Sequence, residues 1–281
     1  MKPDGPRRLD VFERAHLRDP GDRSHVMDRY SSPDDVGDLV RRFWVPRWSV
    51  PPGEVATQRV LQYPVSLVVV TPTYGRFYGV ATGISTTGLE GDGWGVGMMT
   101  QPAAGALLTG GSMDAWTDRF DDLRVAVGAV GDEVVARVRE VMAPDPHAED
   151  AHLAAVEVLA DLVRSVGPID DEGGTVNEVV ELSEEDPSIT DVAALCRATG
   201  LSERALQRLT RRRLGLTPRW LIQRRRLHEA CERLRSGHTT IADVAAELGY
   251  ADQPHLTRDV RSVTGLTPGQ LVARAGDPDR S

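Results

Sequence analysis

The stretch that decides the fold of the last third of the chain is DVAALCRATGLSERALQRLTRRRLGLTPRW, residues 191–220. Much of it returns as DVAAELGYADQPHLTRDVRSVTGLTP at 243–268, at an offset of 52 residues for DVAA and of 50 residues after the turn. The tetrapeptide GLTP closes both copies, at 215–218 and at 265–268. A repeat of this length indicates that one supersecondary unit is used twice.

The first copy has the pattern of two short helices joined by a turn. Thr190 is the predicted N-cap of the first helix, and Gly200 is expected to end it. Ser202 then caps a second helix over about 202–213, in which leucines recur at helical spacing. A short helix, a glycine-containing turn and a second helix are typical of a helix-turn-helix motif.

The second copy repeats this pattern with other capping residues. Thr240 is predicted to cap its first helix, Gly249 to end it, and Asp252 to cap a second helix over 252–263. One long amphipathic helix over 219–235 connects the copies. At 1.5 Å per residue this connecting helix spans roughly 26 Å. When the offset of each second helix from its end is added, the two second helices lie near one turn of DNA apart, about 34 Å.

The second helix of each copy carries outward side chains that suit a nucleic acid. Guanidinium, amide and imidazole groups bind base edges and phosphates. A solvated cationic face is the alternative interpretation, but here the charges recur on the same face of a repeated unit. The candidate DNA-binding residues are Arg204, Gln207, Arg208, Arg211, Arg212, His255, Arg258 and Arg261.

The charge of the chain is divided between its two parts in a way that agrees with DNA binding by the C-terminal part. The total of −9 would argue against a nucleic-acid partner, because phosphate binding depends on cations. Residues 186–281, however, hold 16 of the 33 basic and 11 of the 42 acidic residues, a net charge of +5. Residues 1–185 therefore carry −14. This asymmetry favours an acidic first part joined to a basic DNA-binding domain.

These motifs resemble the DNA-binding domain of the AraC/XylS family of bacterial transcription regulators, over about 188–274. The matching elements are L-Q-R, R-L-x-x-A, I-A-D-V-A-x-E-L-G-Y and the two G-x-T-P sequences. The resemblance implies double-stranded DNA as a partner, RNA polymerase as a second partner, and an activator more than a repressor. It assigns base or phosphate contacts to Arg204, Gln207, Arg208, His255 and Arg258.

The second motif departs from the family pattern. Where the family usually has D-x-S-H-F-x-R-x-F, this chain has DQPHLTRDV at 252–260. Pro254 replaces a polar residue, and Asp259 adds a negative charge next to Arg258. We therefore expect the second helix-turn-helix to bind mainly phosphates, or to bind weakly.

The first part of the chain predicts β-structure. Residues 43–120 hold ten of the fourteen aromatic residues, in short β-branched and aromatic runs separated by Pro and Gly. The predicted fold is α+β with two domains: an N-terminal β-barrel or cupin-like domain with trailing helices, then an all-α domain. The predicted organisation is a loose arm over 1–35, a β-rich regulatory or dimerisation domain over 36–168, a linker over 169–175, the DNA-binding domain over 176–274 and a tail over 275–281.

Two interpretations of the β-rich domain remain open. In one it senses a small molecule, in a pocket lined by aromatic side chains; in the other these side chains are core, and the domain serves to form a homodimer. The helices expected at 132–142 and 150–165 are the candidate dimer surface. The candidate pocket residues are Trp44, Trp48, Tyr63, Tyr74, Tyr78 and Trp94.

Several other classes of function are disfavoured. No histidine occurs over 26–146, so we predict neither a metal site nor a cofactor, and no enzyme. A catalytic N-terminal domain fused to a DNA-binding module is the alternative. The sequence has neither a secretory signal pattern nor a long apolar run, which predicts a cytoplasmic protein without a membrane partner.

Overall fold

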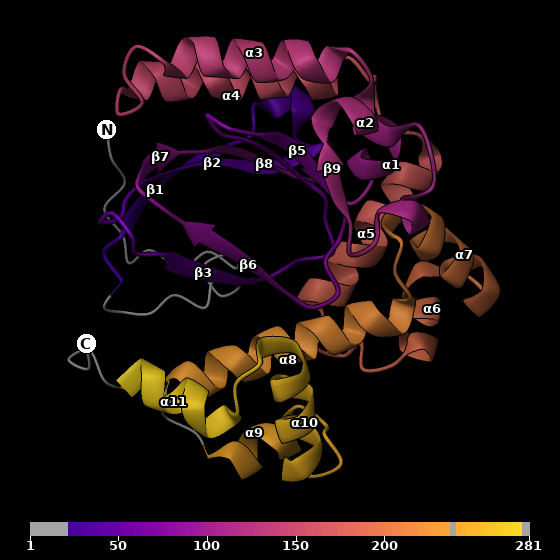
Figure 1. Cartoon of the computed structure of the whole chain (residues 1–281). Helices are drawn as coiled ribbons and strands as arrows, with labels where there is room; N and C mark the ends of the chain where they lie inside the picture. The colour runs from indigo at the N-terminus through magenta and orange to yellow at the C-terminus, as the bar shows by residue number, and fades with distance from the viewer. Residues whose placement is uncertain (1–21, 237–239, 277–281) are drawn as a thin grey trace, which may run out of the picture.

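The computed structural model describes residues 22–236 and 240–276. It has a strand-rich N-terminal domain followed by a helical C-terminal domain, which confirms the predicted α+β fold with two domains (Figure 1). The strands form two sheets that face each other without closing into a barrel. The long helix α8 (Pro218–Ser236) runs past the open side of the smaller sheet.

The larger sheet is antiparallel and has seven strands among the described residues, in the spatial order β1-β2-β8-β4-β5-β9, with β7 also paired to β2. The smaller sheet consists of β3 (Ala56–Leu61) and β6 (Ile84–Leu89). The strands of the larger sheet are β1 (His25–Ser31), β2 (Val40–Ser49), β4 (Leu67–Val70), β5 (Gly75–Tyr78), β7 (Asp92–Trp94), β8 (Val96–Thr100) and β9 (Phe120–Asp122).

Alternation along the strands divides the larger sheet into two different faces. In β2, Phe43 and Val45 are completely buried against the helices, whereas Arg42 and Trp44 lie on the other face and remain half-buried. Successive side chains of a strand point to opposite faces, so one short strand serves both a core and a second surface. The second surface is the one that faces the smaller sheet.

Helices cover the first face of the larger sheet. The long pair α3 (Val130–Met142) and α4 (Glu149–Arg164) lies across it, as Figure 1 shows at the top of the molecule. Their apolar residues, among them Val138 and Leu159, point into the sheet and are completely buried. Shorter elements complete this domain: η2 (Asp34–Val36), α1 (Ala104–Thr109), η3 (Met113–Trp116) and α2 (Leu123–Val127).

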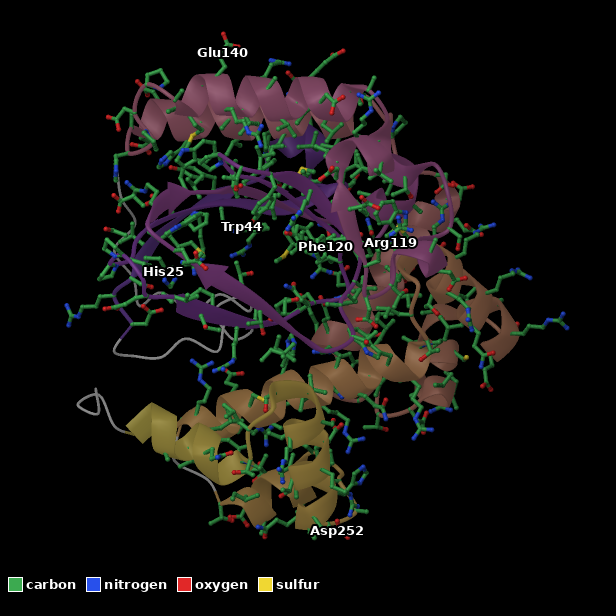
Figure 2. All side chains as sticks on the ribbon, in the orientation of Figure 1. His25, Trp44, Arg119, Phe120, Glu140 and Asp252 are labelled. Atoms are coloured by element: carbon green, nitrogen blue, oxygen red, sulfur yellow. The ribbon has the colours of Figure 1, made fainter. Side chains whose placement is uncertain are left out.

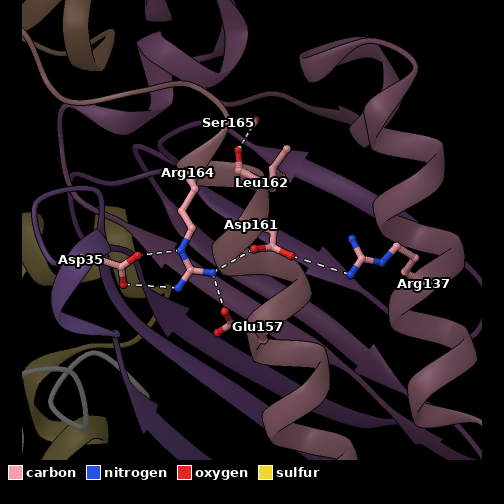
Figure 3. A network of polar contacts seen from close by, with 7 residues as sticks. All are labelled: Asp35, Arg137, Glu157, Asp161, Leu162, Arg164 and Ser165. Atoms are coloured by element: carbon pink, nitrogen blue, oxygen red, sulfur yellow. Dashed lines mark hydrogen bonds and ion pairs between the residues drawn. The ribbon is translucent and has the colours of Figure 1, made fainter.

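The outward face of this helix pair is charged. Arg164 contacts Asp35 at 2.7 Å, Glu157 at 2.5 Å and Asp161 at 2.9 Å, and Asp161 also lies 3.7 Å from Arg137 of α3 (Figure 3). The apolar stripes of 132–142 and 150–165 thus serve the core more than a dimer surface. Leu153 is an exception, because 48% of it is exposed.

The arm predicted over 1–35 is wrong for its last part. Residues 25–31 form β1, which pairs with β2 over its whole length, from His25 opposite Trp48 to Ser31 opposite Arg42. The hydroxyl of Tyr30 also bonds His152 Nδ1 of α4 at 2.7 Å. The polar composition of 25–31 does not predict a strand. The residues that stabilise this strand, in β2 and α4, lie further along the chain. Residues 1–21 of the predicted arm lie outside the described residues.

The linker predicted over 169–175 is wrong as well. Helix α5 (Asp171–Glu185) begins inside it, and the carboxylate of Asp170 caps it by accepting from Gly173 N at 2.7 Å. The helix then bridges the domains, because Glu184 pairs with Arg41 of β2 at 2.9 Å. Acidic residues in a first turn are favourable at a helix N-terminus, which explains how a Gly-rich acidic segment becomes helical.

The C-terminal domain contains the predicted pair of helix-turn-helix units. Leu206 and Leu256, at equivalent positions of the repeat, are both completely buried. Of the predicted caps, Ser202, Thr240 and Asp252 are confirmed, but Asp191 takes the place of Thr190 and accepts from Ala194 N. The remaining helices are α6 (Val192–Thr199), α7 (Glu203–Leu214), α9 (Ile241–Glu247), α10 (Gln253–Thr264) and α11 (Pro268–Gly276).

Each unit packs on part of the N-terminal domain. The cluster around α6 and α7 includes Val80 and Ala103, and the cluster around α9 and α10 includes Leu61 at the end of β3. The predicted tail lies mostly beyond residue 276 and thus outside the described residues. In the described part of the chain, none of the helices combines the length and hydropathy that crossing a membrane requires.

Candidate nucleic-acid interface and intersheet cavity

The first candidate recognition helix is α7. Ser202 caps it by accepting from Ala205 N at 3.3 Å, and Leu206 and Leu209 fix its inner face in the core. Arg204, Gln207 and Arg208 are consequently exposed on the outer face. Gln207 donates to Glu203 at 3.0 Å, so its amide is already extended along the helix surface. The helix presents a cationic face with one amide, which is suited to base edges and phosphates.

The C-terminal end of α7 has a different environment. Arg211 Nε lies 3.2 Å from Asp114 of η3, and Arg212 contacts Glu172 of α5. Arg213 is only 9% exposed and pairs with Asp170 and Glu172. Two of the predicted DNA-binding arginines, Arg211 and Arg212, are therefore paired with carboxylates in this structure.

The second candidate recognition helix is α10. His255, Arg258 and Arg261 are exposed on it, as predicted for residues that contact DNA. Asp259 is half-buried and accepts from the hydroxyl of Tyr250 at 2.9 Å. This bond directs the Asp259 charge toward the domain instead of toward the neighbouring Arg258. Figure 2 shows Asp252, which caps this helix, at the far end of the C-terminal domain.

Tyr250 organises the surroundings of α10. Its ring lies edge-on to the ring of His255 at 5.2 Å, and the guanidinium of Arg226 on α8 lies over it at 4.3 Å. Burial, followed by the charge of Asp259, raises the pKa of Tyr250 above its ordinary value. The phenol is therefore neutral at any physiological pH and acts as a donor to Asp259.

Sequence reasoning missed the contacts between the domains. Thr117 Oγ1 donates to the carbonyl of Gly215, the residue that ends α7, at 2.9 Å. Gly215 has φ +72°, and a Cβ there would lie 2.1 Å from Thr117 Oγ1. Arg224 of α8 donates to the carbonyl of Thr82. The signal in the sequence for the contact between Thr117 and Gly215 is the glycine of the first GLTP, whose lack of a side chain permits the close approach.

A cavity of about 510 Å³ lies between the two sheets. Four of the six predicted pocket residues line it: Trp44, Trp48, Tyr74 and Tyr78. Figure 2 shows His25, Trp44, Phe120 and Arg119 around the space between the sheets. Of the other two, Trp94 is in the core beneath the helices, and Tyr63 packs on His228 at the domain boundary. Trp94 is the last residue of β7 and Tyr63 lies two residues after β3, so the face on which each side chain lies depends on strand register that the sequence does not give.

Two glycines make room for the indole rings of this cavity. A Cβ at Gly97 would lie 2.1 Å from the ring of Trp44, and one at Gly93 would lie 2.4 Å from the ring of Trp48. Trp44 and Trp48 can therefore lie flat on the neighbouring strands instead of filling the space between the sheets. This close approach explains two glycines of the Gly-rich stretch at 91–97, Gly93 and Gly97.

No group of three or more His, Cys, Asp and Glu within residues 22–236 and 240–276 could hold a metal ion. The carboxylates of the site are used in ion pairs and caps, as described for Asp114, Asp170 and Asp252.

Comparison with known proteins gives matches to both parts of the chain. Residues 195–274 match the family described as Helix-turn-helix domain, and residues 28–121 match a Domain of unknown function (DUF6597). The F1 operon positive regulatory protein of Yersinia pestis is 31% identical over 98 residues, 34% of this chain and 33% of that protein. The chain thus matches about a third of the length of this relative.

Solved structures with some likeness include a transcriptional regulator with an AraC-type DNA-binding domain from Chromobacterium violaceum. It is 24% identical over 37% of this chain and 95% of its own, with a TM-score of 0.35. ToxT of Vibrio cholerae is 14% identical over 91% of this chain and 100% of its own, with a TM-score of 0.38.

The repeated units, their caps and the family match define the class of the C-terminal part, which is a double helix-turn-helix DNA-binding domain. Within that class the domain is of the AraC/XylS type, so the family resemblance of the sequence is confirmed.

Proposed function

We propose that this protein is a sequence-specific transcription regulator that binds two successive major grooves of double-stranded DNA through α7 and α10. The observation that supports this is the exposure of cationic residues on equivalent helices of a repeated unit, opposite buried leucines. A helix of this kind fits the major groove, and two of them in one domain can enter successive grooves on one face of the duplex.

Different residues take different parts in this proposal. Arg204, Gln207 and Arg208, near the N-terminal half of α7, are assigned to base edges and adjacent phosphates. Arg211 and Arg212 are assigned to phosphates. On α10, His255, Arg258 and Arg261 are assigned mainly to phosphates, because Pro254 stands where a polar residue would reach a base.

The test begins by selecting duplexes from a random library with the full chain and measuring their affinity at several salt concentrations. Enrichment of one sequence, with an affinity that falls steeply with salt, is the expected result. A matched control is Arg137→Ala, since Arg137 is an exposed arginine on α3 in the other domain. Arg208→Ala should abolish the selected binding and Arg137→Ala should preserve it. Equal affinity for all duplexes would contradict the proposal.

We further propose that the N-terminal domain senses a small molecule in the intersheet cavity. Its volume, about 510 Å³, lies within the range of ligand sites. We assign this domain no catalytic role. We also propose that the protein is an activator that contacts RNA polymerase. It acts as a homodimer, in the cytoplasm, where the DNA is. A thermal-shift screen with metabolites tests the sensor, and light scattering tests the dimer.

A further inference from the structure

Glu203 is the first residue of α7 and its one acidic residue. It is exposed, beside Arg204 and one turn before Gln207, which are exposed as well. The N-terminal end of a recognition helix is the part that reaches base edges in the major groove. The carboxylate of Glu203 therefore lies where its charge repels DNA phosphates but where it can also act on a contact to a base.

The carboxylate of Glu203 fixes the side-chain amide of Gln207. Gln207 Nε2 donates to Glu203 Oε1 at 3.0 Å. The two residues are four apart, so they are neighbours on the helix surface. A glutamine amide has a donor end and an acceptor end. Only the donor end can face a carboxylate, because the amide oxygen would be repelled. Glu203 therefore determines which end of the Gln207 amide lies next to it.

The groups of Gln207 that remain available match the edge of adenine. The bond to Glu203 uses one of the two N–H groups of the amide and leaves the other N–H and the carbonyl oxygen. In the major groove adenine presents N7 as an acceptor and its N6 amino group as a donor, and this N–H and oxygen satisfy both. Guanine presents two acceptors, N7 and O6, so the oxygen of Gln207 would face an acceptor instead of a donor.

The second helix-turn-helix unit lacks this pair. At the offset of 50 residues between the second helices of the two copies, Gln253 stands in place of Glu203 and Thr257 in place of Gln207. A threonine hydroxyl is both a donor and an acceptor and rotates freely, so it does not distinguish adenine from guanine in this way. The pair of a carboxylate and an amide thus belongs to α7 alone of the two recognition helices, which agrees with the assignment of base contacts mainly to α7.

We infer that Glu203 is a positioning residue through which the first recognition helix selects adenine over guanine at the base that Gln207 contacts. The inference rests on the proposed function, because it concerns the base preference of the same DNA-binding face. Glu203 acts through the amide of Gln207 and does not itself contact the base. Its charge lowers the affinity for every duplex, whereas its hydrogen bond raises the selectivity for one base.

The experiment measures the affinity of the full chain, by fluorescence anisotropy, for the duplex selected by the wild-type protein and for duplexes with each other base pair at every position. The position that loses its preference in Gln207→Ala is the one that Gln207 reads. There we expect the wild-type chain to prefer adenine over guanine by about tenfold, and Glu203→Ala to remove most of this preference. The matched control is Glu247→Ala, which removes another exposed carboxylate of the same domain, paired with Arg233, and should leave the preference unchanged.

Two further variants separate positioning from general electrostatics. Glu203→Gln keeps the length of the side chain, but its amide can face either end of Gln207, so the adenine preference should fall as in Glu203→Ala. In a Gln207→Ala background, Glu203→Ala should no longer change any base preference. An unchanged preference in Glu203→Ala, a preferred base other than adenine, or an effect that persists without Gln207 would overturn the inference. A wild-type chain that selects no duplex would instead overturn the proposed function.

Discussion

The hydroxyl of Tyr250 donates to the carboxylate of Asp259 at 2.9 Å, and this bond determines which way the one acidic residue near the centre of α10 points. Asp259 directly follows Arg258 in the chain, so its charge would oppose phosphate binding if it faced the DNA. The bond also connects α10 to the turn that precedes it. The second helix-turn-helix thus depends on a phenol for its electrostatic surface.

Tyr250→Phe is expected to weaken DNA binding by several-fold, because Asp259 becomes free to turn toward the phosphates. We also expect a loss of about 1 kcal/mol in the free energy of unfolding from the missing hydrogen bond. The matched control is Tyr30→Phe, which removes the bond to His152 in the other domain. An anisotropy titration checks both variants, and equal affinities in the two would contradict this role for Tyr250.

Arg208→Ala is expected to abolish specific binding, and Arg258→Ala to weaken it less. The physical reason is that α7 presents a cationic face with an amide, whereas α10 has Pro254 at its first turn and Asp259 beside Arg258. Gel shifts at fixed salt measure the order. Arg258→Ala should also reduce the salt dependence of the affinity by about one phosphate contact. The opposite order would show that the second unit dominates recognition.

Gly97→Ala is expected to destabilise the N-terminal domain by about 1–3 kcal/mol, because its Cβ would lie 2.1 Å from the indole of Trp44. The indole would have to move into the cavity, which should also shift the tryptophan fluorescence. Gly83→Ala is the control, since nothing lies within 4 Å of a Cβ there. Thermal unfolding of both variants provides the measurement; equal midpoints would exclude the close packing of Trp44 on β8.

Cys231 is expected to resist a maleimide in the folded protein at pH 7 to 9. It is completely buried, and burial raises the pKa of its thiol to about 12, so the reactive thiolate forms only well above that pH range. Cys196 is half-buried and serves as the internal comparison. Mass spectrometry should find no label on Cys231 before denaturation and full label afterwards. Rapid native labelling of Cys231 would show that the second helix-turn-helix unit opens.

Much of the C-terminal domain could be predicted because its determinants are local. Caps such as Ser202 and Asp252 act over three residues, and a helical apolar stripe extends over one or two turns. The exposed faces of α7 and α10 follow from the same periodicity. Thr190 was the wrong cap by a single residue, since its neighbour Asp191 has an equally suitable side chain.

The repeat, the class of the C-terminal domain and the division of charge between an acidic first part and a basic last part all follow from the order of the amino acids. Three features required the folded structure: 25–31 is a strand, Tyr63 and Trp94 lie away from the cavity, and Arg211 pairs with Asp114. The physical reason is the distance along the chain over which each kind of interaction acts. Caps and helical faces depend on neighbours within one turn, whereas strand register and ion pairs between domains join residues far apart in the chain.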